Sequence, residues 1–266
     1  MSAVEALERC EGARVRVACL AREPELETSV REFLARAGEQ ATGPELERKL
    51  RVVRFARRSA GEVEVTLAPT TWELGRGFHL AVMARGVPEE LASRWLVRAL
   101  AGEPLTPGLA AVHGIARTRD GELVLARRSA SAAYRPLHWA ATLEEQMIAD
   151  DLREEDALAR ALRRGLHEEL GEAARGAEIT FLTALVELET FNVAFLLAAQ
   201  LRASAAELRE SAACAPDAHE TSALAFVSAE PNALRVLALS GAFAPLHPTS
   251  ALRLEVLARY LESARP

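Results

Sequence analysis

The stretch that decides the fold is RGLHEELGE, which spans residues 164–172. Leu162, Leu166 and Leu170 recur at every fourth position, the spacing of a buried stripe on an amphipathic helix. Gly171 follows the last leucine, and a glycine there can take the left-handed backbone conformation that closes a helix. The stretch therefore predicts the end of a helix that packs against a core.

Carboxylates crowd the other side of this helix end. Residues three and four apart are neighbours on a helix, so Glu172 would lie over both Glu168 and Glu169. Three like charges on one turn repel each other unless a cation lies between them, and oxygen ligands of this kind suit Mg²⁺ or Mn²⁺. A solvated acidic helix end is the alternative, which a Glu-Glu pair alone would favour.

The composition limits the classes of protein to which this chain can belong. The chain has 266 residues, of which 50% are hydrophobic, enough for one large or two modest globular domains. Its net charge of −6 argues against a general nucleic-acid binder. It has neither an apolar run long enough to span a membrane nor a signal-peptide layout at its N-terminus. The three cysteines (Cys10, Cys19 and Cys214) are odd in number and far apart, so we expect reduced thiols in a cytoplasmic protein.

The first 104 residues carry no catalytic motif. Two alternating segments, 51–56 and 62–67, predict strands of a hairpin, residues 25–37 and 88–100 predict helices, and residues 70–79 predict a loop or short helix. Residues 102–108, GEPLTPG, hold two prolines and two glycines. We therefore expect a smaller α+β region at residues 1–104 and a second domain at residues 105–266.

The second domain alternates strands and helices. Asp120-Gly121 between two alternating runs is a strong hairpin signal. The predicted strands are 109–117, 122–127, 179–187, 190–201 and 223–228, and the predicted helices are 154–170, one beginning at Glu230-Pro231, and 248–263. Glu187 and Glu189 flank the turn between two of these strands and are expected at the surface.

The order of elements in the second domain, a hairpin followed by a loop, a helix ending in this motif and further strands, resembles that of the Nudix hydrolases. The signature of this family is Gly-x5-Glu-x7-Arg-Glu-U-x-Glu-Glu-x-Gly-U, where U is a bulky apolar residue. Five residues match at the right spacing: Arg164, Leu166, Glu168, Glu169 and Gly171. Asp156 stands where the first glutamate is expected. The departures are Asp150 for the first glycine, Gly165 for the glutamate after the arginine and Glu172 for the last apolar residue, and the Pro-Gly-Gly segment ahead of the box is absent.

The resemblance implies an α/β fold, a Nudix-like α/β/α sandwich with a mixed sheet, preceded here by the smaller N-terminal region. It also implies a metal-dependent hydrolase that cleaves a nucleoside diphosphate linked to another group, with Mg²⁺ or Mn²⁺ as cofactor. On this reading Glu168 and Glu169 are metal ligands, and Glu172 is a candidate third ligand. Arg164 would orient a glutamate, and Glu220 would act as the distal glutamate that assists the metal or the water.

Gly165 is the main objection, because the family has a metal ligand there. Two readings stay open: a Nudix-type pyrophosphohydrolase with an altered box, and a catalytically impaired Nudix-like module that binds a nucleotide or a protein. An accidental match to the box is a third reading, which the agreeing hairpin and strand order disfavour. The expected partner is a nucleotide-type small molecule, with no membrane and no strong nucleic-acid signal. The oligomeric state is open, with a homodimer as one option.

Overall fold

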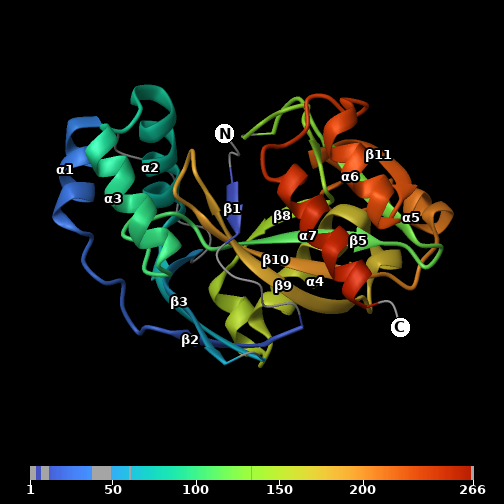
Figure 1. Cartoon of the computed structure of the whole chain (residues 1–266), viewed down its shortest axis with the longest axis horizontal. Helices are drawn as coiled ribbons and strands as arrows, with labels where there is room; N and C mark the ends of the chain where they lie inside the picture. The colour runs from blue at the N-terminus through green and yellow to red at the C-terminus, as the bar shows by residue number, and fades with distance from the viewer. Residues whose placement is uncertain (1–3, 7–11, 38–48, 60, 133, 265–266) are drawn as a thin grey trace. The chain divides into compact units, whose positions relative to one another are not determined.

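The computed structural model describes residues 4–6, 12–37, 49–59, 61–132 and 134–264 (Figure 1). The chain forms two compact units: the first holds Met1–Val112, Gln146–Leu158 and Thr183–Phe195, and the second holds His113–Glu145, Ala159–Leu182 and Leu196–Pro266. Both units combine helices with strands, so the predicted α/β class is confirmed. The domain boundary between residues 104 and 105 stays a prediction. Among the described residues, no helix is long and apolar enough to cross a membrane.

A three-stranded sheet forms one part of the first unit. Its strands are β2 (Arg14–Cys19), β3 (Lys49–Ser59) and β4 (Glu62–Thr70), in the order β2-β4-β3. The predicted hairpin is confirmed, since β3 pairs antiparallel with β4, whereas β2 pairs parallel with it. Alternate residues of β4 (Val63, Val65 and Leu67) are fully buried, as the two-residue period of a strand requires.

Three helices of the first unit pack around Trp95. They are α1 (Thr28–Ala37), α2 (Trp72–Arg85) and α3 (Glu89–Leu100). Phe33, Phe78 and Phe191 surround the indole at ring-centroid distances of 5.5–5.6 Å. The sequence predicted a loop or short helix at residues 70–79, but α2 is a full helix, whose N-cap Thr71 accepts a hydrogen bond from the Leu74 amide at 3.1 Å.

Two smaller elements complete the first unit. Strand β1 (Val4–Ala6) pairs antiparallel with the end of β9 (Glu178–Glu187), and a 3₁₀ turn, η1, spans Ala149–Arg153. The expectation that Glu187 lies at the surface is wrong. Its side chain is buried, and its carboxylate accepts hydrogen bonds from Thr190 Oγ1 at 2.7 Å and Asn192 Nδ2 at 3.4 Å, which satisfy the buried group.

The second unit holds most of a larger sheet, whose strand order is β1-β9-β10-β5-β6-β11, with β7 beside β6 and β8 beside β5. These strands are β5 (Ala111–Arg117), β6 (Glu122–Arg128), β7 (Trp139–Ala140), β8 (Leu143–Gln146), β10 (Val193–Gln200) and β11 (Thr221–Ser228). The predicted hairpin at Asp120-Gly121 is confirmed, with β5 antiparallel to β6 and Gly121 at a φ of 81°.

Helices cover both faces of this sheet. A β-carbon on Gly114 of β5 would lie 2.3 Å from Leu162 Cδ1, so α4 (Ala157–Leu170) packs on that face. Neighbouring strand residues point to opposite faces, so His113 faces the other way, towards Glu144 and α7 (Ser250–Ser263). The second unit therefore has helix, sheet and helix layers.

The remaining helical elements are α5 (Ala205–Ala212), α6 (Pro231–Ser240), η2 (Glu172–Ala174) and η3 (Ala218–Glu220). Helix α6 packs beside α7, as Figure 1 shows, and Arg235 of α6 pairs with Glu255 and Glu262 of α7. The sequence did not predict α5. Its start carries a capping box in which Ser204 and Glu207 bond each other's backbone amide, a pattern visible as Ser-x-x-Glu.

Candidate functional site

Helix α4 places the box residues as the leucine spacing predicted. Leu162, Leu166 and Leu170 are fully buried, and the helix ends at Leu170 because Gly171 turns the backbone to a φ of 78°. The helix begins at Ala157 rather than near Glu154, since residues 154–156 are charged and exposed and bury no apolar side chain. Asp156 lies immediately before the first helical residue, where a carboxylate is favoured by the helix dipole.

Arg164 joins two carboxylates. Its NH1 atom lies 2.8 Å from Glu145 Oε1 on β8 and 3.4 Å from Glu168 Oε2 one turn along α4. All three side chains are partly buried, so solvent screens these pairs less than it would screen surface ion pairs. Arg164 thus fixes the direction of Glu168, and it also ties α4 to β8.

Glu169 is a partly buried carboxylate that feels the charges of two others, Glu145 and Glu220. Burial, together with the neighbouring charges of Glu145 and Glu220, raises its pKa to about 8, although Arg128 and a hydrogen bond from Thr221 act to lower it. The Thr221 Oγ1 donates to Glu169 Oε2 at 3.4 Å. Carboxylates from α4, β8 and η3 therefore act on one another at this point of the second unit.

The structure brings Glu220 to the cluster but leaves Glu172 outside these contacts. Glu220 ends η3, and its carbonyl oxygen accepts a hydrogen bond from the Ser129 amide at 2.7 Å, which fixes the turn beside β6. Glu172 begins η2 after Gly171. Its side chain is 71% exposed and pairs with Arg175 at 2.8 Å and with His167 at 3.8 Å.

Glu145 is the site residue that sequence reasoning missed. A β-carbon on Gly165 would lie 3.0 Å from Glu145 Oε2 and 3.1 Å from its Cβ and Cγ, so this side chain covers the glycine. The two-residue period of a strand was the available signal, because Leu143 is buried against α4 and Glu145 follows two residues later on the same face.

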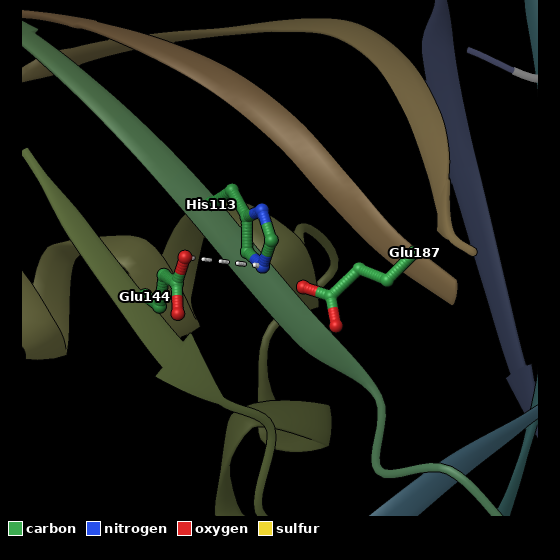
Figure 2. A group of neighbouring side chains, drawn as sticks. All are labelled: His113, Glu144 and Glu187. Atoms are coloured by element: carbon green, nitrogen blue, oxygen red, sulfur yellow. Dashed lines mark ion pairs between the residues drawn. The ribbon is translucent and has the colours of Figure 1, made fainter. Parts of the chain in front are cut away.

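Glu144 points to the opposite face of β8, into a separate buried network. It pairs with Arg253 of α7, its Oε1 lies 3.1 Å from His247 Nδ1, and it lies 4.0 Å from His113 Nε2, the pair that Figure 2 marks. Burial alone would raise the pKa of Glu144, but the charges of Arg253, His247, His113 and Arg128 together outweigh burial and hold that pKa well below its usual range. Burial, with Arg253, holds the pKa of His113 well below its usual value. This network joins α7 to β8.

No protein-family model and no curated protein matches this chain. Solved structures of MutT and Nudix proteins are among its structural neighbours. The alignment with a mutT/nudix family protein from Listeria innocua covers 59% of this chain and 96% of that protein, at 18% identity and a TM-score of 0.40. A MutT protein from Methanosarcina mazei Go1 covers the same shares at 15% identity and a TM-score of 0.34. The DR0079 protein from Deinococcus radiodurans covers 55% of this chain and 81% of its own, at 19% identity and a TM-score of 0.40. The function proposed below rests on the site residues and not on these likenesses.

Proposed function

We propose that this protein is a divalent-metal-dependent hydrolase that cleaves a nucleoside diphosphate linked to another group, a pyrophosphohydrolase of the Nudix type. The observation that carries the proposal is that Arg164 holds two partly buried carboxylates beside Glu169, namely Glu145 of β8 at 2.8 Å and Glu168 of α4 at 3.4 Å. Adjacent carboxylates that are partly shielded from solvent repel each other, so a fold that brings them together bears a cost that a bound cation would offset.

The donor set fits Mg²⁺ or Mn²⁺. The proposed ligands Glu168 and Glu169 and the neighbouring Glu145 offer carboxylate oxygens, which these hard cations prefer. Glu168 and Glu169 would hold the metal, and Glu172 would join them only if its pair with Arg175 opened. When bound, a divalent cation neutralises diphosphate charge and lowers the pKa of a water that it binds.

The chain's own residues have distinct roles in this proposal. Arg164 holds Glu168 in place through its NH1 contact, because a fixed guanidinium restricts the rotamers of the carboxylate it binds. Thr221 donates to Glu169 and thereby orients the carboxylate. Glu220 is exposed and its charge acts on Glu169, and in this proposal it accepts a proton from the attacking water as a general base.

A turnover screen tests the proposal. Purified protein is incubated with a panel of nucleoside diphosphate conjugates and Mg²⁺ or Mn²⁺, and released phosphate monoester is detected after phosphatase treatment. Glu169→Gln should abolish release from any conjugate that the unaltered protein cleaves. Glu210→Gln, which neutralises an exposed glutamate on α5, is the matched control and should leave the rate unchanged.

Gly165 favours a second candidate function, a Nudix-like module that binds a nucleotide or a protein and has lost turnover. The glycine removes from α4 the carboxylate that the family places there. Saturable nucleotide binding with no product from any conjugate would support this alternative. For either function we propose a cytoplasmic protein, and Cys19 and Cys214 carry free thiols.

A further inference from the structure

The face of α4 that lacks a carboxylate at position 165 is covered by a carboxylate from another element. Gly165 is buried, and the space that its β-carbon would fill lies 3.0 Å from Glu145 Oε2. Contacts of 3.0–3.1 Å are tighter than nine in ten real β-carbon contacts, so a larger residue at 165 would require Glu145 to shift by a few tenths of an ångström. The glycine and the glutamate therefore fit each other as a pair.

Strand register explains why Glu145 reaches this place. Leu143 and Glu145 share one face of β8, and Leu143 packs near Leu162 beneath Gly114 on the same side of the sheet. Arg164 then fixes the Glu145 carboxylate, which is 17% exposed, through the 2.8 Å contact between NH1 and Oε1. One carboxylate oxygen faces Arg164, and the other lies over the glycine.

We propose that Glu145 supplies to the metal site the carboxylate that position 165 lacks. The inference rests on the proposed function, because it concerns the same cation. It assigns to β8 a ligand that the box motif would place on α4. Glu145 Oε2 lies 3.0 Å from the point where a side chain at position 165 would begin, and Glu145 shares the Arg164 guanidinium with Glu168, one of the proposed metal ligands.

This arrangement has a mechanical consequence. A cation held by Glu145 and Glu169 would link β8 to α4, whereas ligands from the box alone would all lie on one helix. In the absence of a cation, Arg164 provides the positive charge for Glu145. Arg164 would therefore compete with the metal for this carboxylate.

Mn²⁺ binding to the full chain tests the inference, measured from the electron paramagnetic resonance signal of free Mn²⁺. Glu145→Gln keeps an oxygen that accepts from Arg164 but removes the charge. We expect it to weaken Mn²⁺ binding by at least about tenfold, the scale of loss when groups around a metal are removed. Glu210→Gln, the exposed control on α5, should leave the affinity unchanged. Glu145→Asp, which keeps the charge, should bind more tightly than Glu145→Gln and serves as the second variant if the glutamine variant does not fold.

Arg164→Met separates ligation from positioning. If Glu145 faces the cation, Arg164→Met should weaken Mn²⁺ binding less than Glu145→Gln does, because it frees Glu145 from the competing guanidinium although Glu168 loses the contact that holds it. Equal weakening by Arg164→Met and Glu145→Gln would overturn the inference, because Glu145 would then act only through Arg164. Unchanged Mn²⁺ affinity in Glu145→Gln would overturn it too. Failure of the unaltered chain to bind Mn²⁺ would overturn both this inference and the proposed function, whereas Mn²⁺ binding without turnover would count against the proposed function alone.

Discussion

Replacing Arg253 by methionine should destabilise the protein strongly. The Arg253 side chain is fully buried, pairs with Glu144, and donates to the carbonyl oxygens of Leu143 at 3.2 Å and Ala141 at 3.5 Å. Methionine fills similar space but leaves the Glu144 carboxylate, only 14% exposed, without its main cation. Removing one partner of a buried ion pair costs about 3–5 kcal/mol, so we expect a loss of this size in the free energy of unfolding.

Urea denaturation of Arg253→Met, Glu144→Gln and the double variant measures this loss and the coupling between the two residues. The double variant should cost less than the sum of the two single variants by about 1 kcal/mol or more, because it leaves no charge unpaired. Arg235→Met is the control, since Arg235 pairs with Glu255 and Glu262 in a solvent-accessible position and its loss should cost at most about 1 kcal/mol. Equal losses for Arg253→Met and Arg235→Met would refute the reasoning.

Two further variants test the pH response and the helix end. Burial lowers the pKa of His247 to about 4, against an ordinary value of 6.5. Below pH 6.5 the unfolded chain therefore binds a proton at this residue that the folded chain does not bind. The stability contributed by neutral His247 is fully present above pH 6.5 and falls by about 1.4 kcal/mol per pH unit towards pH 4. In His247→Gln, unfolding free energies measured over this range should fall less steeply, and an unchanged slope would contradict the assignment. Gly171→Ala should lower the stability by about 1–3 kcal/mol, because Gly171 has a φ of 78° and a β-carbon there would lie 2.5 Å from Ser211 Oγ. Gly176→Ala is its control in thermal unfolding, since Gly176 has a similar φ of 72° with nothing within 4 Å of an added β-carbon, and equal losses would show that Ser211 does not matter.

The sequence predicted the elements whose stabilising contacts are local. The leucine period of α4, its closing Gly171 and the Asp120-Gly121 hairpin depend on residues close together in the chain, and the structure confirms all three. Helix α5 also has a local signal, in the capping box of Ser204 and Glu207, but at eight residues it is too short for a clear apolar period.

The remaining site residues depend on contacts between distant parts of the chain. Glu145 and Arg164 are 19 positions apart, and their meeting depends on which strand lies beside α4. Read along the chain, Gly165 is only a missing ligand. In the structure it is also the place that Glu145 covers, a relation that no spacing rule of a single helix contains. Whether Glu168, Glu169, Glu172, Arg164 and Glu220 act in catalysis stays a prediction.

Hydrolysis in ¹⁸O-labelled water, followed by ³¹P NMR, tests the central claim most directly. A nucleoside diphosphate conjugate is incubated with the protein and Mg²⁺, and a parallel sample contains a chelator. The account predicts that the diphosphate resonances give way to two phosphate monoester resonances, one of them shifted by a single ¹⁸O from the attacking water, and that the chelator and Glu169→Gln both prevent this. Diphosphate resonances that persist with every conjugate, although the protein binds Mg²⁺ and nucleotide, would contradict it.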